Sequence, residues 1–207
     1  MFQKKKKEKD KMEQLYQACS GGKVEEVIKL LQNEQINTNW QNPNYPYGTP
    51  FYCACYKGRI EIVKLLLNDK RVDINQADDN GYTPFNRACY GHIELVKLLL
   101  NDNRVDVNKA DKYGQTPFYI ACYCRHIEIV KLLLHGKRVD INKANKDGLS
   151  PFSIACYHGK TEVVKSMLES GREIDINKKN NDGKTGLDFA KQKGNTDIVK
   201  LIESFQK

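Results

Sequence analysis

TPFYIACYCRHIEIVKLLLHGKRVDIN, residues 116–142, is the stretch that decides the fold, because variants of it recur along nearly the whole chain. Close copies occupy residues 49–75 and 83–108, and a looser copy runs over 150–177. The prolines Pro50, Pro84, Pro117 and Pro151 are 34, 33 and 34 residues apart, and Gly186 follows 35 residues later. A fixed period of this size indicates an array of stacked supersecondary units.

Each copy encodes two short helices and a projecting loop. Thr116-Pro117 and its equivalents place a hydroxyl at the N-cap and a proline at the first helical position. A small Ala-Cys pair follows in the first helix, and the second helix begins near Ile60 and its equivalents. That second helix is so apolar that neighbouring repeats must cover it. An extended run and an Xaa-Gly turn, such as Asn80-Gly81, then predict a hairpin-like loop.

The recurring pattern G-x-T-P-F-x-x-A-C-x-x-G-H-I-E-I-V-K-L-L-L, followed by V-D-I-N, resembles the ankyrin repeat over residues 12–207. The resemblance implies an all-α fold, a solenoid of stacked helix-turn-helix units with projecting β-hairpin-like loops. The histidine that usually follows Thr-Pro-Leu in the family is replaced here by Tyr52, Asn86, Tyr119 and Ser153. Other groups must therefore make its hydrogen bonds, or those bonds are lost.

The chain divides into a tail and a single repeat domain. Residues 1–11 are lysine-rich and predict a disordered extension. The ankyrin-repeat domain comprises an N-terminal cap, four full repeats and a C-terminal cap, at 12–44, 45–78, 79–111, 112–145, 146–180 and 181–207. Lys191 stands where other copies carry the cysteine, which predicts that the array ends there. Repeat two has one residue fewer between Cys89 and His92, which predicts a tightened or shortened first helix.

The seven cysteines indicate reduced thiols rather than disulfides or a metal site. Their number is odd, and five of them follow an alanine at the same position of the repeat. We expect small buried thiols that pack as apolar side chains, which suits a reducing compartment, the cytoplasm or the nucleus. The sequence has neither the apolar core of a signal peptide nor an apolar run of about 20 residues.

The resemblance also implies a concave groove that binds partners, lined by the residues after the small pair and those around the turn glycine. The positions on helices are Tyr56, Lys57, Tyr90, Tyr123, Cys124, Tyr157 and His158, and those on hairpins are Asp79, Asn80, Tyr82, Lys112, Tyr113, Gln115, Lys146, Asp147 and Leu149. The tyrosine that follows Ala-Cys in all four repeats offers a large amphipathic contact surface. It either stacks on its neighbours for structure or contacts a partner, and both roles are compatible.

The loop before the first full repeat breaks the period. Residues 36–49 are four longer than the equivalent 107–116 and contain Trp40, Tyr45 and Tyr47. Aromatic side chains are frequent interface anchors, so this loop is either a binding finger or a cover for the first repeat.

Two polar series recur in the loops. Arg71, Arg104 and Arg138 are expected to brace the loops through aspartates or backbone carbonyls, and they stand two residues before Asp73, Asp106 and Asp140. Asn75, Asn108, Asn142 and Asn177 are expected to satisfy the backbone groups of the hairpins.

No catalytic constellation is apparent, since the four histidines are scattered and no phosphate-binding glycine loop occurs. We therefore expect a non-catalytic, monomeric protein-interaction module without cofactor, metal or small-molecule substrate. The net charge of +8 suggests one alternative. Half of it lies in Lys4–Lys11, which predicts binding of nucleic acid or membrane headgroups through the tail. A self-associating scaffold is a third possibility.

Overall fold

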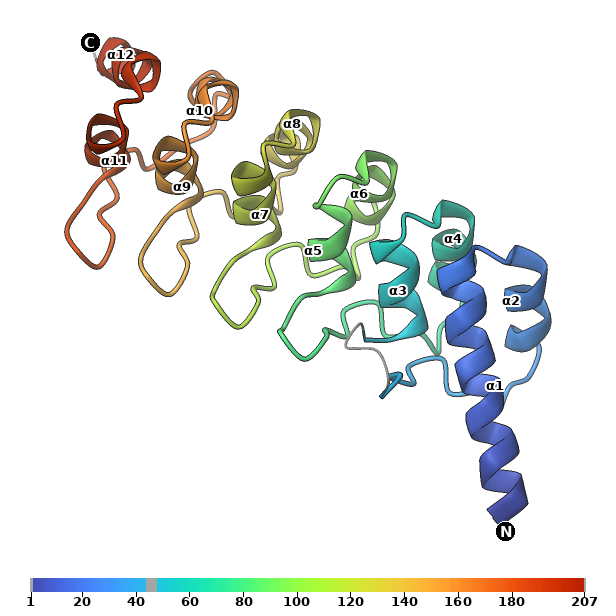
Figure 1. Ribbon diagram of the computed structural model, residues 1–207. Coiled ribbons are helices and arrows are strands. Elements are labelled where there is room, and N and C mark those ends of the chain that lie inside the picture. The colour runs from blue at the N-terminus through green and yellow to red at the C-terminus, as the bar shows by residue number, and fades with distance from the viewer. Residues whose placement is uncertain (1, 44–47, 207) are drawn as a thin grey trace. The chain divides into compact units, whose positions relative to one another are not determined.

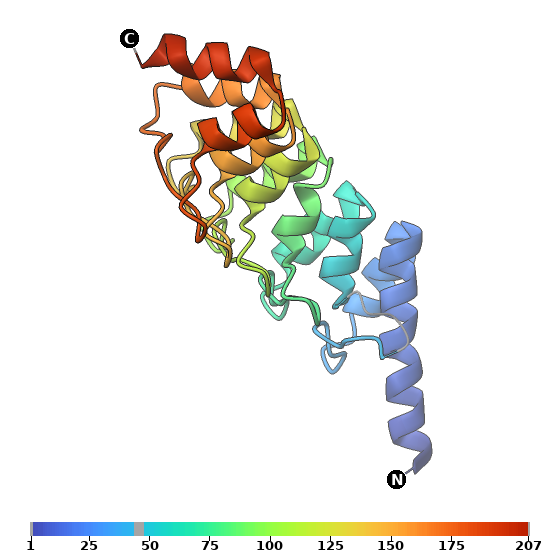
Figure 2. The same ribbon diagram turned by 60° about the vertical axis from the view of Figure 1, so that its left-hand side comes forward.

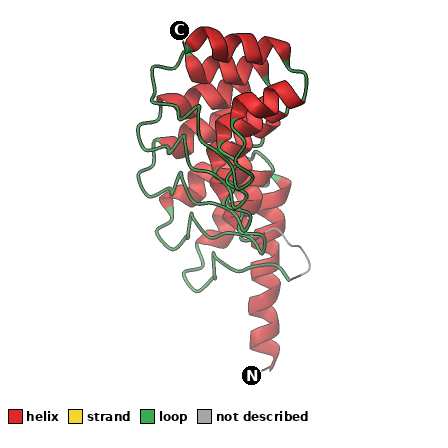
Figure 3. Cartoon of the chain, turned by 90° about the vertical axis from the view of Figure 1, so that its left-hand side faces the viewer, coloured by secondary structure: helices red, strands yellow, loops and turns green. Residues whose placement is uncertain are grey.

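The computed structural model describes residues 2–43 and 48–206. These residues form twelve helices joined by loops and turns, and they contain no strand (Figure 3). Contacts divide the chain into two units. The N-terminal unit extends to Ala88 and includes Asn101–Asp106, and the C-terminal unit comprises Cys89–Leu100 and the chain from Val107 onward. In the described part of the chain, no helix is both long and apolar enough to cross a membrane.

The N-terminal unit is built from five helices: α1 (Phe2–Gly21), α2 (Val24–Leu31), α3 (Pro50–Tyr56), α4 (Ile60–Asn68) and α5 (Pro84–Ala88). Helices α1, α3 and α5 lie side by side in this order, and α2 packs against α4 (Figure 1). Leu15, Phe51, Ile62 and Phe85 are almost completely buried between them.

The C-terminal unit contains α6 (Ile93–Leu100), α7 (Pro117–Cys124), α8 (Ile127–His135), α9 (Pro151–Tyr157), α10 (Thr161–Leu168), α11 (Gly186–Gln192) and α12 (Thr196–Phe205). First helices α7, α9 and α11 pack in one row, and second helices α6, α8, α10 and α12 pack in another (Figure 2). Phe118, Leu133, Phe152 and Val163 fill the space between them.

The helix starts follow the capping signals of the sequence. The hydroxyls of Thr49 and Thr116 accept hydrogen bonds from the backbone N–H groups of Tyr52 and Tyr119, at 3.2 and 3.1 Å. The proline that follows each threonine occupies the first turn, where no N–H is needed. The predicted start of each first helix is confirmed.

The prediction of a disordered N-terminal tail is wrong, because α1 begins at Phe2. Its far end packs through Leu15 and Cys19, which are completely buried. Extending a formed helix needs no new nucleus, and lysine and glutamate are good helix formers. Composition predicts disorder only where no packed helix adjoins the segment.

The shortened first helix of repeat two is confirmed. Helix α5 has five residues, whereas α3 has seven and α7 has eight. Gly91, in the turn that follows, has a φ of 137°, against 68° for Gly58 in repeat one. The loss of one residue therefore shortens the end of the helix and changes the backbone angle of the glycine in the turn that follows.

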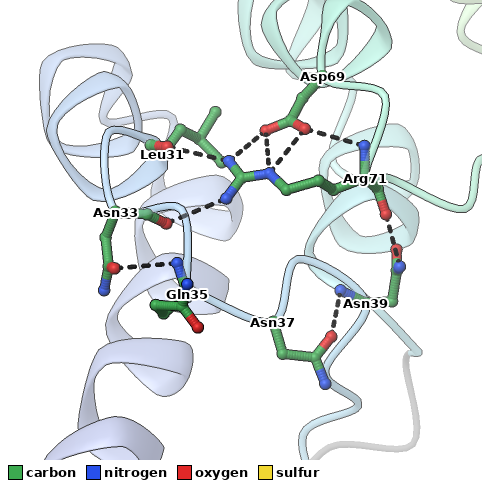
Figure 4. A network of polar contacts seen from close by, with 7 residues as sticks. All are labelled: Leu31, Asn33, Gln35, Asn37, Asn39, Asp69 and Arg71. Atoms are coloured by element: carbon green, nitrogen blue, oxygen red, sulfur yellow. Dashed lines mark hydrogen bonds and ion pairs between the residues drawn. The ribbon is translucent and has the colours of Figure 1, made fainter.

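Arginines brace each loop against the preceding second helix, as predicted. Arg71 donates to the carbonyl oxygens of Leu31 and Asn33, at 2.9 and 3.0 Å, and its guanidinium also pairs with Asp69 (Figure 4). In the same way Arg104 donates to Leu67 and Arg138 to Leu100. These carbonyls lie at helix C-termini, where no N–H of the helix reaches them. The acid that pairs with Arg71 is Asp69, two residues before it, and not Asp73, the aspartate two residues after it that the sequence suggested.

Arg172 has the same role, but the sequence pattern missed it. It donates to the carbonyls of Leu134 and Val139, at 2.9 and 3.0 Å. It stands three residues before Asp175 rather than two, because repeat four has one additional residue at this point.

Asparagines form a second set of braces. The side-chain amide of Asn108 donates to the carbonyl of Arg138 at 2.7 Å and accepts from the N–H of Asp140 at 2.8 Å. Asn75 and Asn142 bridge to the next loop in the same way. So does Asn39 in the N-terminal cap, which the sequence analysis overlooked. The expectation that these amides satisfy backbone groups is confirmed for them.

All seven cysteines are free, and six are buried. Burial raises the pKa of the Cys156 thiol to about 12, which keeps it protonated. Cys124 is the half-buried exception. The prediction of thiols that act as apolar packing groups is therefore confirmed for six of the seven.

Candidate functional site

The repeated tyrosine lies where the first helix turns from the core to solvent. Ala121 and Cys122 are completely buried, whereas Tyr123, the next residue, is 49% exposed. In repeat two the corresponding Tyr90 is 38% exposed. Tyr56 and Tyr157 are half-buried. Successive helical residues point about 100° apart, so the small pair fixes where the tyrosine points.

In the C-terminal unit the tyrosines belong to an aromatic cluster. The ring of His158 lies edge-on to Tyr123 and Tyr157, with centroids 5.0 and 4.9 Å away. Tyr157 also meets Phe189 edge-on at 5.4 Å. These side chains come from α7, α9 and α11 or the turns that follow them. Tyr123 and Tyr157 thus contact side chains of the next repeat and keep solvent-exposed surface, which agrees with both roles considered for the repeated tyrosine.

A hollow of about 480 Å³ lies beside this cluster, between the first helices and the hairpins of the last two repeats. Leu149, Ile154, Tyr157 and Phe189 form its apolar part. Asp147 and Asp182 lie on its hairpin side, with Asn180 and Asn181. An apolar floor with polar groups at its border is suited to holding one side chain of a partner.

The N-terminal unit carries a different arrangement, centred on a buried ion pair. The hydroxyl of Tyr52 donates to Asp78 at 2.6 Å, and Arg87 donates to the same carboxylate at 3.1 Å. Arg87 also donates to the Tyr52 hydroxyl. Its guanidinium carbon lies 4.1 Å from the centre of the Tyr82 ring and 5.6 Å from that of Tyr56. Two predicted groove tyrosines are thus held against one cation.

Burial and charge fix the protonation of this cluster. Burial, then the bond to Asp78, raises the pKa of the Tyr52 hydroxyl well above its ordinary value, so it stays a donor. Burial by itself lowers the pKa of Arg87, but its bonds to Tyr52 and Asp78 outweigh burial and raise it. Arg87 therefore remains a cation although it is largely enclosed.

Sequence reasoning missed Tyr52, Asp78 and Arg87 as a group. The available signal was Arg87, which stands where other copies carry the apolar Cys53, Ile120 and Ile154. In repeat one Tyr52 stands at the position of the family's histidine, and its hydroxyl bonds to Asp78 and Arg87. In repeat four Ser153 instead bonds to the hydroxyl of Ser150 at 3.0 Å.

Each hairpin has an exposed tip, and one polar side chain at its base holds the backbone of the tip. The carboxylate of Asp78 accepts from the N–H groups of Asn80 and Tyr82, both at 2.9 Å. Asp111 and Asn145 hold the next two tips in the same way. The predicted groove residues with exposed side chains are Lys57, Asp79, Asn80, Tyr90, Lys112, Tyr113, Tyr123, Lys146, Asp147 and His158, and the half-buried ones are Tyr56, Tyr82, Gln115, Cys124, Leu149 and Tyr157.

The aromatic loop is described only in part. Trp40 is half-buried, and the neighbouring Asn39 anchors the start of the loop to Arg71 and Asp73. Tyr45 and Tyr47 lie outside the described residues. The choice between binding finger and cover stays open.

Among residues 2–43 and 48–206, no group of three or more histidine, cysteine, aspartate or glutamate side chains could hold a metal ion. The arrangement that the structure offers is an exposed aromatic and polar surface on stacked helix pairs. That is the surface of a repeat-type binding scaffold.

Comparison with known proteins identifies the repeat. The family model for ankyrin repeats matches three times, over residues 2–78, 70–144 and 137–206. The chain therefore belongs to the ankyrin repeat family, and its fold is the all-α ankyrin solenoid. A similar solved structure is that of EF0377, an ankyrin repeat protein, with 29% identity and a TM-score of 0.84. The similarity covers 93% of this chain and 97% of that one. No curated protein matches the sequence.

Proposed function

We propose that the chain is a non-catalytic, monomeric interaction module that holds a protein partner against its first helices and hairpin tips. Ankyrin repeats are in general protein-interaction modules, and the family membership supports the broad class. We further propose that the surface lies at the tyrosine and hairpin positions named above, within each unit.

The observation that carries this proposal is the identity of the exposed apolar side chains. Five large ones are exposed among the described residues, and Tyr90, Tyr113 and Tyr123 are three of them. Each of these tyrosines stands at a predicted groove position, and tyrosine is enriched in binding surfaces because it loses little entropy there. A pre-formed surface on a repeat scaffold also reduces the entropic cost of binding.

The test is the double variant Tyr90→Ala with Tyr123→Ala. Both side chains are substantially exposed, so we expect an unchanged circular dichroism spectrum and a loss of partner proteins in cross-linking mass spectrometry. Phe205→Ala is the matched control, because Phe205 is 56% exposed but lies on the last helix, away from the predicted positions. Equal recovery of partners by the double variant and the control would contradict the proposal.

A second candidate is polyanion binding by the start of α1, because Lys6, Lys7 and Lys9 are exposed there on a helix. It predicts binding to duplex DNA or anionic vesicles that falls steeply with salt and disappears when residues 1–11 are deleted. Binding that survives this deletion would contradict it.

The compartment is proposed from the thiols. Seven free cysteines support a reducing environment, which we take to be the cytoplasm or the nucleus.

A further inference from the structure

Three cations and one histidine of the C-terminal unit lie at the turns that join first to second helices. Arg125 lies in the turn between α7 and α8, His158 and Lys160 lie between α9 and α10, and Lys193 follows α11. We call these four residues the cationic edge. Arg125, His158 and Lys193 are exposed, and Lys160 is half-buried.

Among the described residues, the ion pairs of this unit do not involve the cationic edge. Within the described residues, none of its four members forms an ion pair. Lysines on the second helices do have partners, since Lys97 pairs with Glu94 at 2.7 Å and Lys131 with Glu128 at 3.5 Å. The edge therefore carries uncompensated positive charge.

Two members of the cationic edge, Lys193 and His158, contact the exposed aromatic cluster. The amine of Lys193 lies 4.4 Å from the centre of the Tyr157 ring, and His158 contacts the rings of Tyr123 and Tyr157. Burial, then the charges of Lys160 and Lys193, lowers the pKa of His158 below its ordinary value. His158 is therefore neutral at pH 7, and it lies close enough to Lys160 and Lys193 to be affected by both charges.

Arg125 adds an independent sign of function. Its φ is 63°, the left-handed conformation, and it is the one residue other than glycine with a positive φ in the described chain. The equivalent turns use Gly159 and Gly194, with φ of 64° and 69°. Residues other than glycine rarely adopt this conformation, and strain of this kind is often kept at binding sites. Glycine would adopt this conformation without strain, so the turn itself does not explain an arginine at this position. A role of its positive charge in binding would explain it.

The residues that line the hollow favour one chemical class of partner over another. Its apolar part, Leu149, Ile154, Tyr157 and Phe189, suits an apolar side chain. Its hairpin side carries the carboxylates of Asp147 and Asp182, which would repel a phosphate backbone. A nucleic acid therefore fits this surface less well than a polypeptide that carries acidic groups on one side.

We infer that the cationic edge and the hollow together bind an acidic protein segment. Its carboxylates pair with Arg125, Lys160 and Lys193 and accept a hydrogen bond from the neutral His158 ring, and one of its apolar side chains enters the hollow. This inference rests on the proposed interaction function and adds the chemical class of the partner.

Fluorescence anisotropy with the full chain tests the inference. The probe is a fluorescein-labelled peptide of twelve residues, with aspartate and glutamate on one side of a central leucine and uncharged polar residues on the other. A second peptide carries asparagine and glutamine in place of the acids, and a labelled twelve-nucleotide oligothymidylate represents nucleic acid. Low salt is used because screening weakens exposed pairs. We expect binding of the acidic peptide alone.

The variant Lys160→Gln with Lys193→Gln removes two charges and should weaken binding of the acidic peptide roughly three- to tenfold. Its matched control is Lys97→Gln with Lys131→Gln, which removes two lysines from second helices and should leave the affinity unchanged. Equal loss in both variants, equal binding of the amide peptide, or binding of the oligonucleotide instead would overturn the inference.

Arg125→Gly separates binding from folding. Glycine relieves the left-handed strain, so we expect Tm to rise by about 2–4 °C while acidic-peptide affinity falls. A gain in stability with unchanged affinity would show that Arg125 takes no part in binding and would contradict the assigned edge.

The same assays distinguish this inference from the function on which it rests. If Tyr90→Ala with Tyr123→Ala abolishes partner cross-links while the acidic peptide does not bind, the interaction function stands and the acidic partner is wrong. If neither the cross-links nor peptide binding depends on these surfaces, both proposals fail.

Discussion

Arg87 shows how one residue changes the chemistry of its repeat. At its position the other copies bury an apolar side chain, yet Arg87 is enclosed with Asp78 and Tyr52 and lies over the ring of Tyr82. An enclosed ion pair adds little stability over an apolar pair, but removing one partner leaves the other charge buried without compensation. The positions of the Tyr52 and Tyr82 side chains therefore depend on the guanidinium group of Arg87.

We predict that Arg87→Ala lowers the free energy of unfolding by about 3 kcal/mol, because Asp78, whose side chain is 1% exposed, loses its counter-charge. Urea titration followed by circular dichroism measures the change. Lys64→Ala breaks an exposed pair with Glu61 and should cost less than about 1 kcal/mol. If Arg87→Ala costs no more than Lys64→Ala, the cluster has no structural role.

Asp69 gives a pH-dependent prediction. Its hydrogen bonds with Arg71 lower its folded-state pKa, although burial opposes the shift. A folded pKa below the unfolded one contributes stability above the ordinary aspartate pKa near 4, and this stability is lost as the pH falls through the folded pKa. Unfolding free energies of wild type and Asp69→Asn, measured from pH 6 to pH 2.5, should therefore converge at low pH. Parallel profiles would show that the pair contributes nothing.

At the scale of the element, the repeat is a helix pair tied to the next pair through its loop. Helix starts, the second helices and the glycine turns follow from local signals, which is why the sequence predicts them well. Loop braces need residues about one repeat apart. Asn108 reaches Arg138 and Asp140, and Arg104 reaches Leu67. The recurrence of these residue types indicated bracing, but their partners follow only from the packed structure.

We predict that Asn108→Ala destabilises the protein by about 1–2 kcal/mol, since it removes two hydrogen bonds to the backbone of the next loop. Asn177→Ala is the matched control at the same position of the last loop. Its side chain has one long contact, 3.5 Å to Gln206, so the expected loss is below about 0.5 kcal/mol. Chemical denaturation compares the two variants, and equal losses would mean that the braces are not energetically important.

At the scale of the whole molecule, the cysteines report on the integrity of the fold. Six thiols are buried inside the stacked helices and one, Cys124, is half-buried beside the aromatic cluster. Burial raises the pKa of the Cys89 and Cys122 thiols far above their ordinary value, so the reactive thiolate is scarce as well as inaccessible.

We predict that a disulfide reagent such as DTNB titrates about one thiol in the native protein and all seven in denaturant, where burial is lost. Cys124→Ser should abolish the fast native reaction, and Cys122→Ser, two residues away, should leave it unchanged. Rapid reaction of several thiols without denaturant would mean that the helix stack opens readily.

The sequence by itself determined the repeat, the class of fold and the place of nearly every helix. It did so because the period, the Thr-Pro starts, the Ala-Cys pairs and the glycine turns act within a few residues, and each is repeated several times. The same local logic explained the shortened helix α5 from one missing residue.

Only the tertiary structure decided what these repeats bring together. The contact of Arg87 with Tyr52, the hollow beside Tyr157 and the approach of Lys193 to Tyr157 join residues that lie about one repeat apart along the chain. The helical start of α1 likewise depends on a packed end that composition does not reveal. Such features arise from the stacking of one repeat on the next, and a local pattern, however often it recurs, does not specify which side chains then meet.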